Sequence, residues 1–506
     1  MKSVVRSQKS ETRGRESHTA LFIFAFCLLT FNLLSLNACL FRATTPSLAR
    51  NFPSASRLNH QGKNPVIVIP GALGSQLVNH RTGEKVWPSL TDSVDDTLTL
   101  PIESANFAES SDDLVASEIL ETAKFSRLIP EISVYDQLLS ALQRYGGYRR
   151  GNLDAPPSDG DQDTFYVFAY DWRRDNVESA RLLARKIAAF KQKLGRPELR
   201  FDVIAHSMGG LVARYYAMYG DRDVLDSTSP TPDWAGARHL GKLIMMGTPN
   251  AGSMDAFRSL LQGYSITETS HPHIALLSPL NRDSIFTYPS AYELLPRNAG
   301  AHFLDGQLSG LNLNLFDIET WRRYKWSAAF NVQLGKGEQK ALLNEEGEGA
   351  VTRVTAQLAA GRERFLRLAL ARAAAFHRAL DADSTSPDSL RLCLFGGDCE
   401  DTLDAVVIIT DKKTGQPLTL FRPSRAISDR KVRNSAWKAM FVPGDGRVTR
   451  RSLFGLRLEP DLNDPLPQAM KQRPYYAVFD CEIHGDLPLN LRVQNNLMTM
   501  LLGNSY

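Results

Sequence analysis

The feature that most constrains the fold is a ten-residue segment in which an apolar run meets a serine and two glycines. Residues 201–210 are FDVIAHSMGG, and helical spacing continues from there to Gly220. A serine between a buried strand and a helix is typical of a nucleophile elbow, a strained turn that exposes the hydroxyl above the sheet. The usual pattern is Gly-x-Ser-x-Gly, and Ala205 replaces the first glycine with another small residue. We therefore predict that Ser207 is a nucleophile; the alternative is an ordinary serine in a buried turn.

Short apolar runs and helical segments alternate along the rest of the chain. Six runs predict strands, at Pro65–Pro70, Phe165–Tyr170, Phe201–Ala205, Leu243–Met246, Ala405–Ile409 and Tyr475–Phe479. Three segments that stop at glycines predict helices, at Val134–Tyr145, Val177–Leu194 and Gly209–Tyr219. Continuous apolar strands suit a sheet buried on both faces, and such sheets are parallel. The alternation predicts an α/β fold with a mostly parallel, doubly wound sheet and helices on both faces.

Two intervals are too long for simple crossovers and predict insertions. One lies at about 79–130, and the other, at 251–403, would form a cap or lid over the carboxyl ends of the strands. The second contains a basic, Ala-rich helix around Ala356–Leu380, which we interpret as a solvated helix with one packed face rather than a membrane-docking helix. The expected division is a signal or anchor at 1–39, a linker at 40–62, a core at 63–250, a cap at 251–403 and a second core part at 404–506.

A serine nucleophile needs a histidine base and a carboxylate that orients the base. In folds with a nucleophile elbow, the chain order is serine, acid, histidine. His484 follows the last predicted strand, where such a fold places its base. His239 precedes a strand, and His206 is adjacent to Ser207 and is expected to be structural. The remaining histidines after Ser207 lie in the cap interval: His271, His273, His302 and His377.

The acid is expected in a turn after the penultimate strand. Asp445 lies there between two glycines, although a Gly-Asp-Gly triplet also occurs in ordinary turns. Asp404 is a rival candidate. Asp480 and Asp486 are further rivals, but both are too close to His484 in sequence to fit the expected order.

An oxyanion hole requires two backbone N–H groups aimed at the developing charge. One donor follows the nucleophile, which is Met208. The other comes from the loop after an earlier strand, and Ala72 in the glycine-rich loop at 70–74 is the candidate. Gly71 and Gly74 would permit close approach of the substrate. A simple glycine turn is the alternative.

The N-terminus predicts export. Residues 1–20 are polar and basic, Leu21–Leu36 is apolar but short for a membrane span, and a small residue precedes Cys39. We expect a signal peptide that ends in lipidation of Cys39, which gives a membrane-anchored periplasmic or cell-surface protein. An uncleaved signal anchor is the alternative.

The chain has five cysteines and a net charge of +4. Cys27 would leave with the signal, Cys393 and Cys399 could pair in an oxidising compartment, and Cys481 would remain alone. No cysteine or histidine spacing suggests a metal site, and we expect neither a metal nor a cofactor. The basic residues form no long runs, which argues against a nucleic-acid partner. The oligomeric state is left open.

Several segments together resemble the lecithin–cholesterol acyltransferase family of α/β-hydrolase lipases and acyltransferases, in the form of a bacterial lipoprotein-like member. They cover residues 65 to about 502 in family order: PVIVIPGALGSQL at 65–77, VWP at 86–88, YDWR at 170–173, AHSMG at 205–209, GTPNAGS at 247–253, 289–296, GDGRV at 444–448 and His484. The YDWR and GTP blocks are the most specific of these. Two departures are Ala205 and the lack of a cysteine pair near Trp87, and most of 297–403 matches nothing in the family.

The resemblance implies an α/β-hydrolase fold and a serine-dependent lipid ester hydrolase or O-acyltransferase acting on a phospholipid or other acyl-lipid at a membrane surface. It assigns catalysis to Ser207, Asp445 and His484. Leu73 and Trp87 are implied in substrate binding, Trp87 on a membrane- or acyl-facing surface. The alternative function is a catalytically silent surface lipoprotein that uses the fold as a binding scaffold.

Overall fold

The computed structural model describes residues 45–52, 63–88, 97–104, 107, 112–123, 132–157, 163–264, 280–297, 302–330, 332, 334, 336–345, 347–455, 475–479 and 481–503. The expected signal segment at 1–39 lies outside these residues, as do His271, His273 and Asp480. The chain divides into two units, Met1–Ser47 and Leu48–Tyr506, and all elements below belong to the second. Within the described ranges, no helix is both long and apolar enough to cross a membrane.

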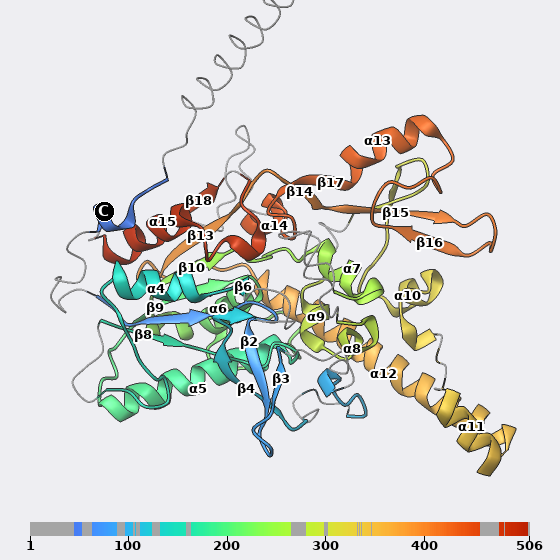
Figure 1. Cartoon of the computed structure of the whole chain (residues 1–506), viewed down its shortest axis with the longest axis horizontal. Helices are drawn as coiled ribbons and strands as arrows, with labels where there is room; N and C mark the ends of the chain where they lie inside the picture. The colour runs from blue at the N-terminus through green and yellow to red at the C-terminus, as the bar shows by residue number, and fades with distance from the viewer. Residues whose placement is uncertain are drawn as a thin grey trace, which may run out of the picture. The chain divides into compact units, whose positions relative to one another are not determined.

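A seven-stranded sheet in which all neighbouring strands are parallel forms the centre of the second unit (Figure 1). In spatial order its strands are β18 (Tyr475–Phe479), β13 (Arg391–Gly397), β10 (Leu240–Met246), β9 (Phe201–His206), β1 (Val66–Ile69), β8 (Thr164–Val167) and β7 (Arg149–Arg150). Successive side chains of β1 enter different cores: Val66 and Val68 pack on one face, Ile67 and Ile69 on the other. All four are buried, which is why the strand is apolar throughout.

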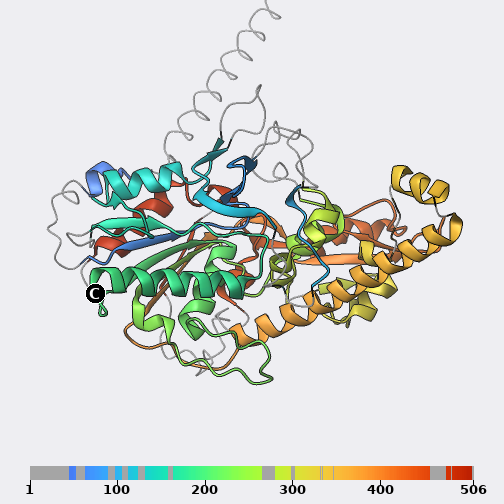
Figure 2. The same cartoon turned by 90° about the horizontal axis from the view of Figure 1, so that it is seen from below.

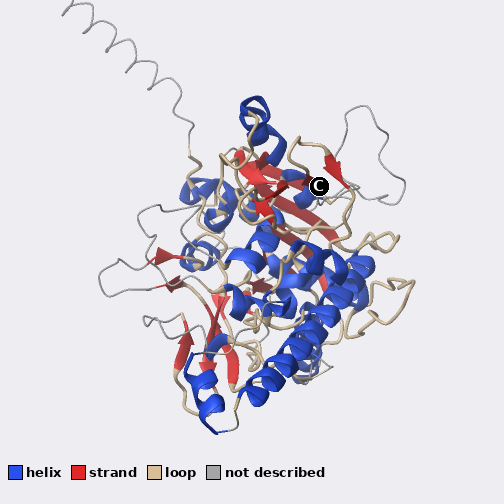
Figure 3. Cartoon of the chain, turned by 90° about the vertical axis from the view of Figure 1, so that its right-hand side faces the viewer, coloured by secondary structure: helices blue, strands red, loops and turns tan. Residues whose placement is uncertain are grey.

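Helices cover both faces of this sheet. On one face lie α4 (Asp136–Arg144) and α15 (Leu491–Leu502), and on the other lie α5 (Asn176–Leu194) and α6 (Met208–Tyr219). Figure 2 shows α4 and α5 on opposite sides of the strands, and in Figure 3 the red strands pass between blue helices. The predicted doubly wound sheet and the α/β-hydrolase fold are thereby confirmed.

The first insertion, after β1, forms small antiparallel sheets. Its strands are β2 (Ser75–Asn79), β3 (Lys85–Trp87) and β4 (Leu114–Ile119), in the order β3-β2-β4, followed by the pair β5 (Thr122–Ala123) and β6 (Ile132–Ser133). This insertion brings Trp87 back toward the loop after β1, because the Trp87 indole N–H donates to the Leu73 carbonyl at 2.9 Å.

The second insertion lies between β10 and β13. It contains α7 (Met254–Gln262), α8 (Arg282–Phe286), α9 (Pro289–Glu293), β11 (His302–Leu304), β12 (Gly310–Leu311), α10 (Ile318–Tyr324), α11 (Lys336–Glu345) and α12 (Glu348–Leu380). The second half of α12 buries one apolar face that includes Phe365, Leu366 and Phe376, and Arg372 on that helix pairs with Asp175 and Asp223. The basic helix therefore has the packed face that the sequence predicted.

The penultimate strand of the sheet differs from the prediction. The run at Ala405–Ile409 is a strand, β15 (Ala405–Thr410), but it belongs to a separate four-stranded sheet in the order β12-β11-β15-β16 (Pro417–Leu420). The strand of the central sheet is β13, which lies inside the interval 251–403 expected to be cap, so the core resumes at Arg391. Both runs are buried, and an apolar run predicts burial without specifying which sheet the strand joins.

The remaining elements connect this side sheet to the core. They are β14 (Glu400–Leu403), α13 (Arg430–Met440), β17 (Phe441–Gly444), α14 (Arg450–Phe454) and the short helix η7 (His484–Asp486); smaller pieces elsewhere are α2 (Leu48–Asn51), η3 (Gly236–His239) and η6 (Ala328–Phe330). β14 pairs antiparallel with β17, which ends at the residue before Asp445.

Candidate active site

Ser207 occupies the sharp turn between β9 and α6, with φ 52° and ψ −125°. A positive φ is unfavourable for serine, so the surrounding structure must hold the turn in place. The Ser207 N–H donates to the Met246 carbonyl at 2.7 Å. A Cβ added to Gly71 would lie 2.8 Å from the Ser207 Cβ, and one added to Gly209 would lie 2.3 Å from the Pro70 carbonyl oxygen. A small residue is therefore required two residues after Ser207, as the sequence pattern predicted, and also at Gly71 in the loop after β1.

The structure brings Ser207, His484 and Asp445 together. His484 Nδ1 lies 2.8 Å from Asp445 Oδ2, and His484 Nε2 lies 2.9 Å from Ser207 Oγ. Because the carboxylate can only accept, Nδ1 carries the hydrogen and Nε2 is left to accept from the hydroxyl. Among the described residues, the carboxylate bonded to His484 is that of Asp445 and not that of the rival Asp404. His239 is bonded elsewhere, to Lys191 Nζ at 2.8 Å.

Asp445 is buried and held by the backbone on its other oxygen. Its Oδ1 accepts from the N–H groups of Arg447 at 3.0 Å and Val448 at 2.7 Å, and its carbonyl accepts from the His484 N–H at 2.9 Å. The backbone of the turn that contains Gly444-Asp445-Gly446 thus fixes the orientation of the carboxylate toward the imidazole. Two glycines pack against this pair. A Cβ added to Gly247 would lie 3.0 Å from His484 Nδ1, and a Cβ added to Gly397 would lie 2.9 Å from the Asp445 Cβ.

His206 takes part in a second buried chain of hydrogen bonds beside the elbow. Its Nδ1 lies 2.7 Å from the Tyr135 hydroxyl, and its Nε2 lies 3.0 Å from the His484 carbonyl oxygen. The carbonyl can only accept, so Nε2 carries the hydrogen and the tyrosine donates to Nδ1. The same hydroxyl accepts from the Gly71 N–H at 2.9 Å. Burial, and then the neighbouring His484, lower the pKa of His206 to about 3, so the ring is neutral at physiological pH.

His206 therefore has the structural position that was expected, and Tyr135 is a residue that sequence reasoning missed. Tyr135 lies at the start of α4, and nothing in its own segment marked it. Together the two rings connect the loop after β1, the elbow and the backbone of His484.

The predicted oxyanion donors are both beside Ser207. Ala72 and Met208 line the cavity that contains Ser207. Neither backbone N–H donates to an acceptor among the described residues, so both remain available to a ligand. Leu73 has φ 64°, which turns the chain sharply next to Ala72.

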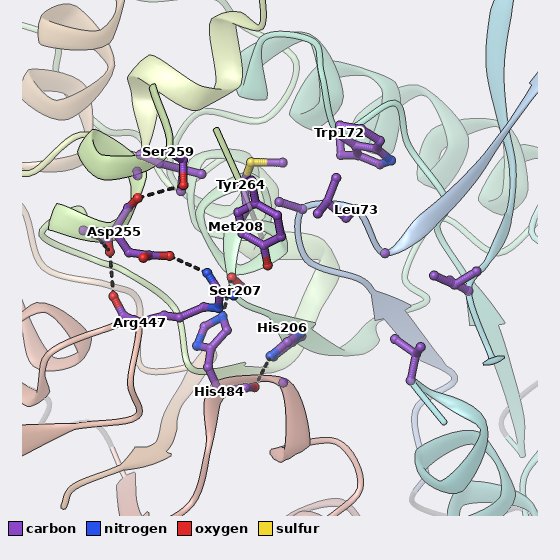
Figure 4. Close-up of a pocket in the computed structure, with 18 of the residues that line it drawn as sticks. Leu73, Trp172, His206, Ser207, Met208, Asp255, Ser259, Tyr264, Arg447 and His484 are labelled. Atoms are coloured by element: carbon purple, nitrogen blue, oxygen red, sulfur yellow. Dashed lines mark hydrogen bonds and ion pairs between the residues drawn. The ribbon is translucent and has the colours of Figure 1, made fainter. Parts of the chain in front are cut away.

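The cavity has a volume of about 280 Å³ and a mainly apolar lining. Leu73 and Trp87, the two predicted substrate-binding residues, are both part of this lining. Trp87 is only 4% exposed and meets Trp172 edge to face at 5.6 Å, so it faces the cavity rather than an outer surface. Figure 4 shows Ser207 beside the His484 ring, with Leu73 and Trp172 on one side and Asp255 and Arg447 on the other.

A buried ion cluster in the cavity wall was also missed. Asp255 on α7 pairs with Arg258 at 2.5 Å and with Arg447, whose guanidinium stacks 4.5 Å from the Tyr264 ring centroid. Burial raises the pKa of Asp255, but the two arginines outweigh it and the net shift is downward. The cluster ties the cap to the turn that carries Asp445. Arg447 was visible in the GDGRV motif, whereas no local pattern marked Asp255.

The disulfide prediction was wrong. Cys399 bonds to Cys481, and Cys393 is free and buried. Cys393 lies in the middle of β13 and points into the core, whereas Cys399 and Cys481 follow the ends of the neighbouring strands β13 and β18. Adjacent strand ends bring distant residues together, which closeness in sequence does not reveal. Among the described residues, the one group spaced to hold a metal ion is Cys399, Glu400 and Cys481, and its sulfurs form this bond.

One family model and two solved structures align with the chain. The family model for lecithin:cholesterol acyltransferase matches residues 114–345, which confirms the resemblance inferred from the motifs. A chain of the Tle4–Tli4 complex aligns at 16% identity over 88% of this chain and 100% of that chain, with a TM-score of 0.45. Staphylococcus hyicus lipase aligns at 13% identity over 87% of this chain and 94% of its own, with a TM-score of 0.32. No curated protein matches the sequence. The family match supports action on acyl-lipid esters, by hydrolysis or by acyl transfer.

Proposed function

We propose that the chain is a serine-dependent lipid ester hydrolase or O-acyltransferase that works through an acyl-enzyme on Ser207. The observation that carries the proposal is the unbroken hydrogen-bonded line from Asp445 Oδ2 through His484 to Ser207 Oγ, with distances of 2.8 Å and 2.9 Å. The line ends in an apolar cavity, next to two backbone N–H groups that have no partner among the described residues.

Each residue has one role in the proposed first half-reaction. Ser207 Oγ attacks the ester carbonyl carbon while His484 Nε2 takes the hydroxyl proton. The N–H groups of Ala72 and Met208 stabilise the resulting oxyanion, and Asp445 stabilises the imidazolium without taking its proton. The carbon–oxygen bond to the leaving alcohol then breaks, and His484 returns the proton to that alcohol. The acyl group remains on Ser207.

The second half-reaction decides between hydrolysis and transfer. His484 takes a proton from water or from an acceptor alcohol, whose oxygen attacks the acyl carbon. The bond from that carbon to Ser207 Oγ then breaks, His484 returns the proton to Ser207 Oγ, and an acid or a new ester is released. Both outcomes use the same residues. The acyl donor proposed here is a phospholipid or another acyl-lipid, because the cavity wall at Leu73, Trp87 and Trp172 offers apolar surface for an acyl chain.

A covalent active-site probe tests the nucleophile. A fluorophosphonate should label the full chain, and Ser207→Ala should abolish labelling because it removes the oxygen that attacks phosphorus. The matched control is Ser259→Ala, which removes another hydroxyl that lines the same cavity. Labelling that survives Ser207→Ala, or a folded wild-type protein that never labels, would contradict the proposal and favour the silent binding scaffold.

Product analysis then separates the two reactions. The purified protein is incubated with a phospholipid, alone and with a sterol or a simple alcohol, and the lipid products are separated. A new ester in the presence of the alcohol indicates transfer, and free fatty acid in both samples indicates hydrolysis. Neither product, from protein that does label, would contradict a phospholipid donor.

The cellular setting is proposed from the N-terminus. We infer export by the segment 1–39, with lipidation of Cys39 and attachment to a membrane on the periplasmic or cell-surface side. Metabolic labelling with a fatty acid, in wild type and Cys39→Ala, tests this inference. Equal labelling of both proteins would contradict lipidation at Cys39.

A further inference from the structure

Positive charge is concentrated in one segment that contributes no residue to the cavity lining. Residues 404–440 contain eight lysines and arginines and three aspartates, a net charge of +5 within a chain whose total is +4. They fold as the hairpin β15–β16 and the helix α13, which lie next to one another in Figure 1. We call these residues the basic segment. Its basic side chains are Lys412, Lys413, Arg422, Arg425, Arg430, Lys431, Arg433 and Lys438.

The described part of the chain supplies no carboxylate partner for the charges of the basic segment. Seven of the eight side chains are exposed, and Arg433 is half-buried. None of the eight forms an ion pair with a carboxylate in the described part of the chain. The arginines of α12 behave differently, since Arg372 bridges Asp175 and Asp223 and Arg367 pairs with Glu363. Exposed cations that have no carboxylate partner among the described residues are available to an external anion.

Two large apolar side chains are exposed within the same segment. Trp437 on α13 is 42% exposed, and Leu418 on β16 is 39% exposed. One face of the Trp437 ring stacks on Phe441 with centroids 4.4 Å apart, and its N–H donates to Asp401 at 3.0 Å. The indole is thus fixed in orientation while part of it stays open to solvent. A tryptophan among lysines and arginines is typical of surfaces that sit at a lipid headgroup layer.

We propose that the basic segment docks the protein on an anionic lipid bilayer. An anionic surface fits the unpaired positive charge, and the exposed tryptophan and leucine favour a lipid surface over a nucleic acid, which offers phosphates but no apolar layer to enter. The choice also rests in part on the proposed function, because an enzyme that acts on acyl-lipids must reach a lipid surface. β17 continues from α13 into Asp445, so the docking surface is directly connected to the turn that carries the proposed acid.

Vesicle co-sedimentation tests the proposal, with Ser207→Ala in every protein so that turnover does not alter the lipids. The full chain is mixed with phosphatidylcholine vesicles, with and without about 30% phosphatidylglycerol. The difference between the two measures charge-dependent docking, because any contribution of the apolar N-terminus is common to both. We expect at least about tenfold stronger binding to the anionic vesicles, largely lost when salt is raised from about 0.05 M to about 0.5 M.

Two variants with the same change in net charge test whether the basic segment causes the binding to anionic vesicles. The test variant carries Lys412→Glu, Lys413→Glu, Arg430→Glu and Lys431→Glu, and the control carries Lys85→Glu, Arg144→Glu, Arg185→Glu and Arg238→Glu. The control residues are also exposed and form no ion pair with a described residue, but they lie in other parts of the unit. The test variant should lose at least about tenfold of its binding to anionic vesicles, and the control should lose about threefold or less.

Three outcomes would overturn the proposal: equal binding to both vesicle types, equal losses in test and control variants, or binding of a DNA duplex at the same salt without binding of anionic vesicles. Failure of this proposal is distinguishable from failure of the proposed function. Vesicle binding is measured without Ser207, whereas the fluorophosphonate label requires Ser207 and no vesicle.

Discussion

The residues around Ser207 and the basic segment are two polar regions of one unit that differ in how their polar groups are satisfied. At Ser207, the polar atoms of His484, Asp445, His206 and Tyr135 are hydrogen-bonded to one another or to the backbone, in a buried setting. In the basic segment, seven of the eight cations are exposed, and none of the eight forms an ion pair with a described carboxylate. The polar groups of the first region are satisfied within the protein. The cations of the second region have no carboxylate partner among the described residues.

Because their polar groups are satisfied differently, the two regions should respond differently to substitution. A buried group that loses its partner costs about 1–3 kcal/mol, so changes near Ser207 should affect both the fold and the chemistry. An exposed charge that has no partner contributes little to the fold, so changes in the basic segment should affect binding alone. The helix α12 belongs with the first region despite its basic composition, because Arg362, Arg367 and Arg372 pair with carboxylates and one face is packed.

The largest expected effect is that of Asp445→Asn. The amide would present a donor to His484 Nδ1, which forces the other tautomer and removes the acceptor that Ser207 needs. We expect kcat for a soluble ester to fall roughly 10³- to 10⁴-fold. Steady-state kinetics measures the loss, and circular dichroism checks that the variant is folded. A loss below about tenfold would show that this carboxylate does not orient the base.

A smaller effect is expected for Tyr135→Phe, which removes the hydroxyl that joins His206 to Gly71. Two buried polar groups lose a partner, so we expect about 2–4 kcal/mol less stability and a roughly tenfold lower kcat with little change in KM. Tyr148→Phe is the matched control, because this buried hydroxyl has no hydrogen-bond partner among the described residues. If the two variants lose equal activity, the chain through His206 does not position the base.

Stability should depend on pH through the buried histidines. The pKa of His206 and the pKa of His377 are each lowered to about 3, chiefly by burial. Below the ordinary histidine pKa of about 6.5, the unfolded chain takes up protons that the folded chain refuses. The free energy of unfolding should therefore fall by about 1.4 kcal/mol per pH unit for each histidine as the pH drops from about 6.5 toward 3.

Urea unfolding at several pH values, in wild type and His377→Gln, measures this dependence. His377 lies on α12, away from Ser207, so the substitution tests the titration without removing a residue of the proposed mechanism. The variant should show a shallower loss of stability with falling pH. A slope equal to that of wild type would mean that His377 titrates normally in the fold.

The smallest effect is expected for the four-glutamate variant of the basic segment. On a soluble ester, its kcat/KM should remain within about twofold of wild type, and its free energy of unfolding within about 2 kcal/mol, because surface substitutions typically change stability by up to 0.5 kcal/mol each. Kinetics and urea unfolding give both numbers. A large loss of soluble-ester activity would place these side chains in the first region and remove the contrast.

The sequence predicted those parts of the molecule that local pattern determines. The elbow at 201–210 predicted Ser207 and the strand and helix around it. Chain order favoured His484 and left Asp445 with rivals, and the family resemblance selected Asp445. The apolar runs predicted most strands of the central sheet. The catalytic assignment of these residues remains a prediction until the probe and the variants are measured.

The features that sequence did not predict depend on pairing between distant segments. The membership of β13 and β15 in different sheets, the bond between Cys399 and Cys481, and the contact of Tyr135 with His206 each join residues whose own neighbours are unremarkable. The positive charge of the basic segment was also not evident from local sequence. The segment has no long run of basic residues, and its net charge of +5 appears only when all of residues 404–440 are counted together.

The glycines packed around Ser207, Asp445 and His484 limit which substitutions the active site can accept. One additional methyl group would press on Ser207 from Gly71, on the end of β1 from Gly209, on the His484 ring from Gly247 and on the Asp445 Cβ from Gly397. Retention of the active-site geometry in evolution therefore depends on glycines that supply no reactive atom. Over generations, a lineage could discard this chemistry through a single alanine while all three reactive residues were still encoded.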